Sequence, residues 1–223
     1  MKKKNNIFLE VCKRTHPKYV EFRNRHYVEN KGCHGQQIHF LIYYKNQIVG
    51  IISGASSVYA VKSRDDFFKI PKDKQLKEKY YLPSIINNVV FRLELHKKNL
   101  ATQILSKWRK VVVELWENLY NIKVIGFETF VVETDTRKGC LYKADNWSYV
   151  GITQGSTKCH KGLTSKSTRK SVSKKLVYCK WIKNIPITPI KKYISCWRME
   201  TKTEKDRAKQ LSNLKKNLLG VKF

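Results

Sequence analysis

The sequence has 223 residues and a formal net charge of +29, because 46 lysines and arginines face 17 aspartates and glutamates. A chain of this length can bury a full core, and its 41% hydrophobic content excludes a disordered basic tail. The charge predicts a polyanionic partner, with nucleic acid as the first candidate. No apolar run approaches the roughly 20 residues that span a bilayer, so we expect no membrane partner.

The first third of the chain predicts a helix, a hairpin and a charged connector. Pro17 favours a helix start within a basic and aromatic stretch. Two apolar runs, residues 38–44 and 47–54, are separated by two polar residues, which predicts a β-hairpin with a two-residue turn. The small residues 54–57 either let a ligand approach or pack closely beneath a helix. Residues 69–79 are charged and predict a solvated loop or a surface helix.

Two amides, Asn87 and Asn88, interrupt the next apolar run, residues 85–95. A buried amide costs about 2 kcal/mol or more unless it is paired, so these residues indicate a bulge, the mouth of a strand or a site. A helix is predicted over residues 100–119, where apolar residues recur at helical spacing, and Asn99 is expected to be its N-cap.

The stretch over residues 122–153 holds the densest group of polar and aromatic side chains. An apolar, β-branched run over residues 124–132 predicts a buried strand, residues 141–145 have helical spacing, and residues 147–153 alternate like a second strand. This density exceeds what packing alone needs. The side chains concerned are Glu128, Tyr142, Asp145, Asn146 and Trp147.

A basic loop over residues 154–175 holds no acidic residue and almost no apolar one. Its hydroxyl, amide and ammonium groups are the donors that contact backbone phosphates, so we predict that it binds DNA; a solvated insertion between two strands is the alternative. A C-terminal helical tail, residues 200–223, is expected to cap the domain or meet a partner. The DNA-binding side chains expected in the loop are Lys158, Lys161, Lys166, Arg169, Lys170, Lys174 and Lys175.

The predicted order of hairpin, strand, long helix, strand, short helix and strand resembles the GNAT acetyltransferase fold. The resemblance implies an α/β (α+β) domain over residues 1–199, with a mixed central sheet, flanking helices and the basic loop as an insertion. In that family a helix N-terminus after the fourth strand holds the pyrophosphate of coenzyme A, which implies cofactor contacts at Asn99, Leu100 and Ala101. The segment has no glycine, so the cofactor stays unknown, with acetyl-coenzyme A or a similar acyl donor as the candidate.

The core, residues 35–182, also resembles the DruA proteins of Druantia anti-phage systems. Residues 139–147 carry a further resemblance to the phage Mom proteins, which modify DNA adenine. The DruA resemblance is carried by Arg64-Asp65, Asn88, Phe91-Arg92-Leu93, Asn99-Leu100-Ala101, Ile104-Leu105, residues 128–131, 139–147 and 150–155, and a late strand at 176–179.

Two functions follow as hypotheses. The first, which we favour for its polar cluster, is a transferase that modifies a DNA base, with Asp145, Tyr142 and Glu128 as catalytic residues. The second is a non-catalytic DNA-binding component of a phage or anti-phage defence system, which the missing glycines favour. The substrate contacts expected for the enzyme are Asn88, Arg92, Asn146, Trp147, Arg64 and Asp65.

The remaining expectations concern partners, metal and compartment. Besides DNA, other phage or defence-system proteins are possible partners. No metal is predicted, because the Cys-His pairs at residues 33–34 and 159–160 have adjacent side chains that point apart in extended backbone. The basic N-terminus has no apolar stretch of signal-peptide length, so we expect a cytoplasmic protein. An AT-rich coding genome would also raise the lysine count without selection for binding.

Overall fold

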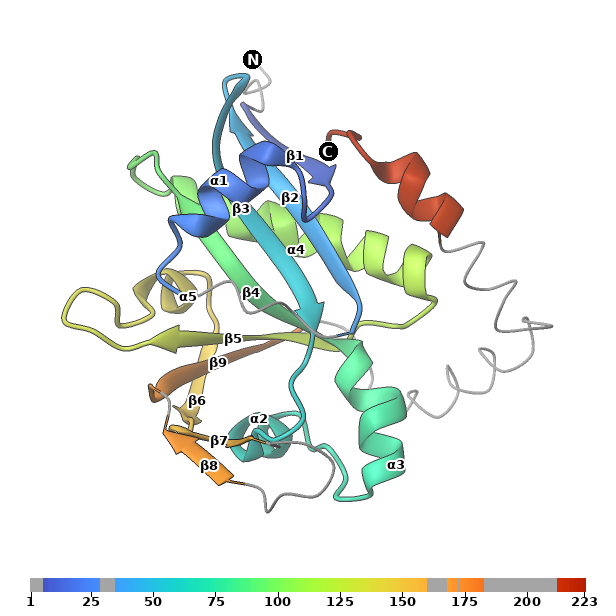
Figure 1. The fold of residues 1–223 in the computed structure, drawn as a ribbon, viewed down its shortest axis with the longest axis vertical. Coiled ribbons are helices and arrows are strands. Elements are labelled where there is room, and N and C mark those ends of the chain that lie inside the picture. The colour runs from blue at the N-terminus through green and yellow to red at the C-terminus, as the bar shows by residue number, and fades with distance from the viewer. Residues whose placement is uncertain (1–5, 29–34, 160–167, 172, 183–211) are drawn as a thin grey trace.

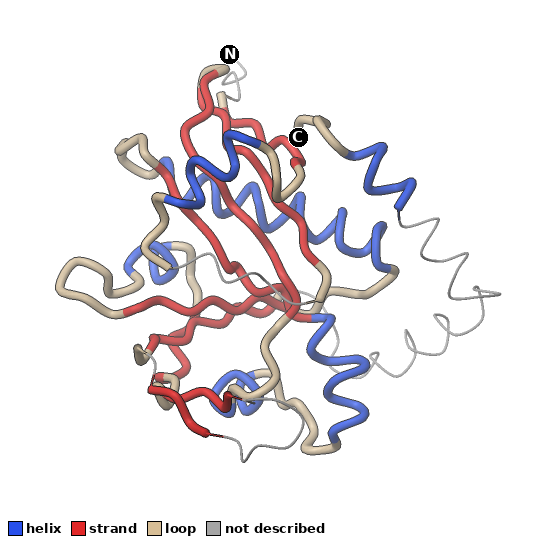
Figure 2. The backbone as a smooth tube through the Cα atoms, viewed as in Figure 1, coloured by secondary structure: helices blue, strands red, loops and turns tan. Residues whose placement is uncertain are grey.

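The computed structural model describes residues 6–28, 35–159, 168–171, 173–182 and 212–223. These form a mixed α/β fold around a seven-stranded sheet with the strand order β1-β2-β3-β4-β5-β9-β6, and a separate two-stranded hairpin, β7-β8 (Figures 1 and 2). Helix α1 covers one face of the sheet and helix α4 the other. The mixed α/β class predicted from the sequence is confirmed.

The elements that the sequence predicts follow one another in the predicted order. The structure adds a strand at Ile7–Cys12, a helix at Lys62–Phe67 and two short strands within the predicted basic loop, Ser156–Cys159 and Thr168–Ser171. The strands are β1 (Ile7–Cys12), β2 (Gln37–Tyr44), β3 (Gln47–Ser56), β4 (Ile85–Leu93), β5 (Gly126–Val132), β6 (Ser148–Ile152), β7 (Ser156–Cys159), β8 (Thr168–Ser171) and β9 (Lys175–Trp181). The helices are α1 (Pro17–Asn24), α2 (Lys62–Phe67), α3 (Lys74–Leu76), α4 (Leu100–Tyr120) and α5 (Cys140–Ala144). Short π and 3-10 turns, Lys77–Tyr81 and Leu82–Ser84, lead into β4, and residues 212–218 form a last helix.

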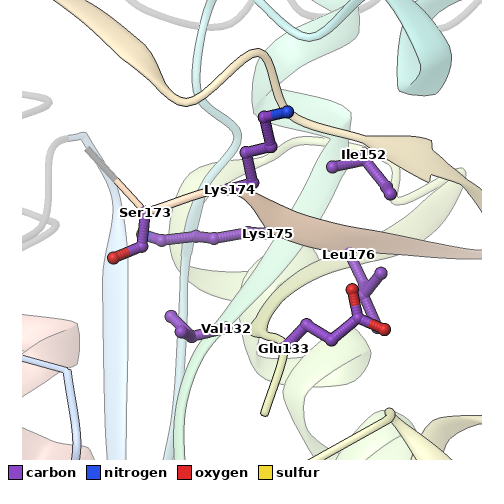
Figure 3. A pocket seen from close by; sticks show the side chains of 7 residues that line it. All are labelled: Val132, Glu133, Ile152, Ser173, Lys174, Lys175 and Leu176. Atoms are coloured by element: carbon purple, nitrogen blue, oxygen red, sulfur yellow. The ribbon is translucent and has the colours of Figure 1, made fainter. Parts of the chain in front are cut away.

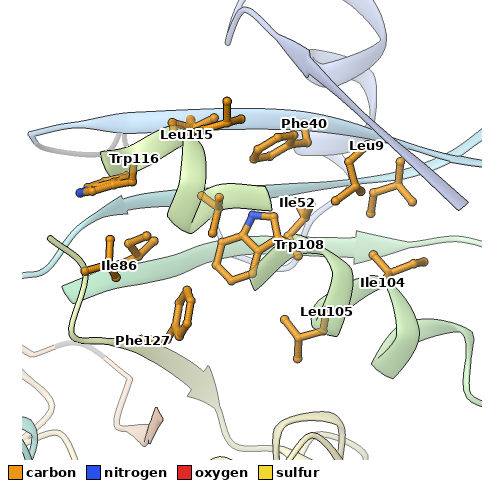
Figure 4. Packing of buried hydrophobic residues seen from close by; sticks show 14 of the residues in the cluster. Leu9, Phe40, Ile52, Ile86, Ile104, Leu105, Trp108, Leu115, Trp116 and Phe127 are labelled. Carbon is orange, nitrogen blue, oxygen red and sulfur yellow. The ribbon is translucent and has the colours of Figure 1, made fainter. Parts of the chain in front are cut away.

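Alternation along the strands divides the core between the two faces of the sheet. In β2, Phe40 and Ile42 pack against α4, whereas Leu41 packs against Tyr19 and Phe22 of α1. On the α4 side, the fully buried ring of Trp108 lies at the centre of the cluster, with aromatic and aliphatic side chains of the sheet around it (Figure 4). The apolar stripe predicted for α4 therefore does bury its side chains against the sheet.

The predicted β2-β3 hairpin forms because its two turn residues adopt left-handed backbone. Lys45 and Asn46 have φ of 50° and 66°, which matches the twist that a two-residue turn needs between antiparallel strands. Of the small residues 54–57, Gly54 in the last part of β3 serves close packing beneath α4. A Cβ at Gly54 would lie 2.8 Å from Cγ2 of Ile86 and 3.3 Å from the Trp108 ring.

Asn99 does not cap α4 as the sequence analysis expected. It has φ 61° and ψ 0°, and its side chain makes no capping hydrogen bond. A capping side chain needs extended backbone to reach the amides of the first turn, and left-handed backbone turns it away. The expected N-cap is therefore wrong, although Asn99 does mark the start of the helix.

The C-terminal residues cover the outer edge of the sheet at β1. Backbone hydrogen bonds join Leu9 to Phe223 in both directions, and the amide of Val11 donates to the carbonyl of Val221. An exposed sheet edge invites pairing with another chain, and this segment occupies it. Of the alternatives for the tail, its last residues cap the domain. None of the helices in the described part of the chain is long and apolar enough to cross a membrane.

A buried imidazole should make the fold sensitive to mild acid. Nδ1 of His39 lies 3.0 Å from Oγ of Ser53, and burial, with smaller contributions from Arg14 and Lys215, lowers the pKa of His39 to about 4. Its ordinary pKa is 6.5, so between these values the unfolded chain binds a proton that the folded chain does not. The unfolding free energy should therefore fall as the pH falls through this window.

Substitution of the imidazole isolates its contribution from those of other titrating groups. We expect His39→Asn to reduce the fall in unfolding free energy between pH 6 and pH 5 by about 1 kcal/mol. Urea unfolding of both proteins at the two pH values measures this difference. An identical pH dependence in the two proteins would show that folding does not lower the pKa of His39.

Candidate functional site

The parallel strands β4 and β5 pair over only three residues and then part. Ile85, Ile86 and Asn87 face Gly126, Phe127 and Glu128, and no further pairs follow although both strands continue. Figure 1 shows the two strands diverging toward their carboxyl ends. In open sheets, ligands bind beyond the carboxyl ends of parallel strands, so this opening is a candidate site.

Asn88 lies at the parting and makes three hydrogen bonds. Its Nδ2 donates to the carbonyls of Ser53 (3.1 Å) and Val90 (3.2 Å), and its Oδ1 accepts from the phenol of Tyr142 (2.8 Å). The register of β4 against β3 shifts here, so the residue lies at a bulge within the strand. Oδ1 of the neighbouring Asn87 is buried and has no partner within the described residues.

Tyr142 is the predicted catalytic residue that lies closest to this opening. Burial raises the pKa of its phenol well above 10. The phenol therefore keeps its proton at neutral pH, so it can donate a hydrogen bond but is unsuited to removing a proton. Its ring stacks on Tyr178 with centroids 6.0 Å apart and meets the Trp147 ring edge-on at 5.1 Å.

Arg25 and Tyr27, which we call the α1 strap, connect the two strands across the opening. The guanidinium of Arg25 donates to Glu94 just beyond β4 (3.0 Å), and the guanidinium of Arg92 donates to the carbonyl of Arg25. On the other side, the guanidinium of Arg137, in the loop after β5, lies 4.3 Å from the ring centroid of Tyr27. The structure thus places Arg92 at the strap rather than beside Tyr142.

Glu128 lies on the opposite face of β5 and forms a fully buried ion pair with Arg64 of α2. Nη1 of Arg64 lies 2.5 Å from Oε2 of Glu128, and both side chains are fully buried. Burial raises the pKa of Glu128, and the Arg64 guanidinium and the amide of Val58 oppose this rise. Nε of Arg64 also donates to Asp65 (2.6 Å), which pairs with Lys77.

Asp145 ties α5 to α4 with both carboxylate oxygens. Arg109 of α4 donates to them through two nitrogens, at 2.7 and 2.8 Å, and the indole of Trp147 donates at 2.8 Å. Nζ of Lys180 donates to the carbonyls of Asp145 (2.6 Å) and Asn146 (3.0 Å). Trp147 is buried, and the side chain of Asn146 is exposed. These bonds indicate that Asp145 has a structural role, in which it holds α5 against α4.

A pocket of about 330 Å³ opens where β5 and β6 end and β9 begins (Figure 3). Three lining residues are charged, and their side chains make no hydrogen bond or ion pair with another described residue. The pocket thus offers two ammonium groups, a hydroxyl and a carboxylate beside aliphatic walls. Its lining residues are Val132, Glu133, Ile152, Ser173, Lys174, Lys175 and Leu176.

The structure distributes the sequence-predicted site residues over separate clusters. Tyr142 and Asn88 meet at the opening, Glu128, Arg64 and Asp65 form the ion-paired cluster, and Asp145 pairs with Arg109. None of these side chains lines the pocket of Figure 3. Asn99, Leu100 and Ala101 begin α4, as expected.

The predicted DNA-binding loop is described in part. Lys158 lies in β7, Arg169 and Lys170 lie in β8, and Lys174 and Lys175 line the pocket, whereas Lys161 and Lys166 lie outside the described residues. The Cys-His pairs include residues outside this part as well. Within the described residues, no group of three histidine, cysteine or acidic side chains is gathered that could hold a metal ion.

Sequence reasoning named Lys174 and Lys175 but missed the other five residues that line the pocket: Val132, Glu133, Ile152, Ser173 and Leu176. They lie at the ends of β5 and β6 and around the start of β9. The available signal was a change from apolar to polar residues where each run stops, at 132–133 and at 173–176. That signal shows where a strand ends, but not which strand ends lie together.

The mixed sheet, with a helix between two parting parallel strands, places the chain in the mixed α/β class of folds. The family is assigned by comparison of the sequence with known families. A family model described as Druantia protein DruA matches residues 7–180. The chain therefore belongs to the DruA family, whose systems serve anti-phage defence, and the resemblance found in the sequence is confirmed. Among curated proteins, none matches this chain.

The solved structures to which the chain is similar include GNAT acetyltransferases. One from Elizabethkingia anophelis, with acetyl-CoA bound, has 9% identity and a TM-score of 0.48, covering 80% of this chain and 100% of that one. The ribosomal-protein-S5-alanine acetyltransferase from Vibrio fischeri has 10% identity and a TM-score of 0.47, covering 82% and 98%. The Campylobacter jejuni N-acetyltransferase PseH has 9% identity and a TM-score of 0.44, covering 79% and 98%. Likenesses this weak say nothing about chemistry.

The bonding of Asp145 predicts a large effect of its removal on stability. Asp145→Asn leaves the guanidinium of Arg109 without its carboxylate, and we expect the unfolding free energy to fall by about 2 kcal/mol or more. Asp66→Asn is the matched control, because Asp66 forms an exposed ion pair with Lys62 and should change stability by less than about 0.5 kcal/mol. Urea unfolding at pH 7 measures the stability of both variants. If Asp145→Asn is as stable as Asp66→Asn, the Asp145–Arg109 ion pair does not stabilise the fold and Asp145 has another role.

Proposed function

We propose that this chain is an acyltransferase-like component of Druantia defence that acts on a DNA base. The observation that carries the proposal is the parting of β4 and β5 beside Tyr142. An opening at the centre of a sheet, next to a protonated phenol, is a place where a ligand would find a polar partner.

The start of α4 fits the phosphate end of an acyl donor of the coenzyme A kind. The amide of Leu100 donates to the carbonyl of Lys97, whereas the amides of Ala101 and Thr102 lie in the first turn, where a helix offers no acceptor. Asn99 supplies, with its positive φ, the turn that a glycine would give. Such a donor would bring the acyl group, and these amides would hold its pyrophosphate.

The acceptor would be a base that has left the DNA stack, because an atom inside a duplex cannot reach the centre of a sheet. Tyr142 would donate a hydrogen bond at the reacting group, because burial raises the pKa of its phenol and the proton stays on the oxygen at neutral pH. Lys174 and Lys175 are exposed and half-buried, respectively, beside the carboxyl end of β5. They would hold the backbone phosphates that flank the base.

A second candidate function is a DNA-binding component without catalysis. Two observations favour it: the α1 strap crosses the opening, and the carboxylates of Glu128 and Asp145 are both engaged in ion pairs. Both candidates require DNA binding, so they differ only in whether a base is modified.

Nucleoside mass spectrometry separates the two candidates. We expect DNA from cells that express the protein to carry a base with an added acyl mass, and Tyr142→Phe to reduce that adduct at least tenfold, because it removes the hydrogen-bond donor and keeps the ring. Tyr149→Phe is the matched control, since this hydroxyl lies on an exposed edge strand. DNA without any adduct, from a wild-type protein that binds DNA, would establish the second candidate.

The contribution of the two pocket lysines can be read from the salt dependence of DNA binding. For a double variant, Lys174→Gln with Lys175→Gln, we expect weaker binding and a slope of log K against log salt smaller by about 2, because two phosphate contacts are lost. The control changes charge by the same amount elsewhere: Lys45→Gln with Lys123→Gln, two exposed lysines in other turns. Equal slopes in the two double variants would place DNA away from the pocket.

A further inference from the structure

The loop between β3 and α2 presents two exposed apolar side chains. Val58 is 43% exposed and Tyr59 is 46% exposed. The loop precedes α2, whose residues pack against β6 and β9 in the face of the sheet that also holds the Arg64–Glu128 ion pair.

The loop is held by the most deeply buried charges in the described part of the chain. Nη2 of Arg64 donates to the carbonyl of Val58 (2.7 Å) and to that of Tyr59 (3.4 Å). The amide of Val58 donates to Oε1 of Glu128 (3.3 Å), and the hydroxyl of Ser57 donates to the carbonyl of Ile85 (3.0 Å). Four hydrogen bonds to fully or partly buried groups thus hold the backbone of the exposed loop.

A fully buried ion pair contributes little net free energy to the stability of a fold. Apolar side chains of the same volume would stabilise it as well or better, because the desolvation of Arg64 and Glu128 offsets much of their attraction. What only the charged pair provides is a set of directed bonds to the loop backbone. The bonds fix the backbone that carries the exposed ring of Tyr59, so a ligand of the ring would meet a loop that is already ordered.

The surroundings of Tyr59 favour a nucleic acid over an apolar partner. Nζ of Lys77 lies 4.6 Å from its ring centroid and also pairs with Asp65, whereas Lys62 of α2 pairs with Asp66 at the surface, where an ion pair is weak. The chain as a whole carries a net charge of +29. An unpaired base can stack on such an exposed ring while its phosphate replaces the carboxylate on the exposed ammonium group.

From these contacts we infer that Tyr59 is a stacking platform for an unpaired DNA base, held in position by the Arg64–Glu128 ion pair. The inference rests on the proposed function only in its DNA contact and not in acyl transfer. It also specifies the substrate: single-stranded DNA, or DNA with a base out of the stack, is bound in preference to an intact duplex.

Binding of a short single strand that contains 2-aminopurine tests the inference, with anisotropy for affinity and base fluorescence for stacking. We expect Tyr59→Ala to weaken single-strand binding about tenfold and to abolish the quenching, whereas Tyr59→Phe keeps both. The salt slope should be the same in all three proteins, because the ring neutralises no phosphate. Duplex DNA of the same sequence should show a smaller effect of the Tyr59→Ala change.

Tyr149→Ala is the matched control. Tyr149 is 50% exposed, and its ring contacts Tyr178, whereas the next residue, Val150, packs with Val61 and Phe68 on the α2 side. It therefore lies on the opposite face, and its loss should leave the quenching unchanged. A wild-type protein that binds the strand while Tyr59→Ala binds it equally well overturns the inference alone and assigns the loop to a protein partner. A wild-type protein that binds no DNA overturns the proposed function as well.

Discussion

The parting of β4 and β5 after three residue pairs is the constraint on which the centre of this protein depends. Two neighbouring strands there lose their shared backbone hydrogen bonds inside a buried sheet, where polar groups must find partners. Side chains supply some of these partners: the hydroxyl of Thr129 donates to the carbonyl of Asn88, and the amide of Asn88 reaches two carbonyls of β3 and β4. The polar residues at the centre are therefore a consequence of the opening.

Each polar group at the parting also brings a flanking element to the sheet. Tyr142 joins α5 to Asn88, and Glu128 joins α2 and its preceding loop through Arg64. Asp145 extends the same principle to α4 through Arg109. Because each bond has a direction, these contacts fix where the flanking elements stand, which apolar packing of equal strength would leave less determined.

Local patterns predicted the elements of the fold but not the partners of its buried polar side chains. The hairpin and α4 were predictable, because a two-residue turn and an apolar stripe are written in neighbouring residues. Arg64 and Glu128 are 64 residues apart, and Arg109 and Asp145 are 36 apart, so no local pattern joins them. Sequence reasoning identified the unusual residues correctly as polar groups within apolar runs, but placed them in one pocket.

The bonding at the centre limits which chemistry the chain can supply. Among the described residues there, Glu128 and Asp145 are both ion-paired, so neither carboxylate is free to approach a substrate. Tyr142 retains its proton. A transfer reaction at this opening would thus find a hydrogen-bond donor in Tyr142 but neither carboxylate free to act as a base, and the attacking group would lose its proton to water. Since the α1 strap lies across the same opening, its displacement would have to accompany the entry of a substrate.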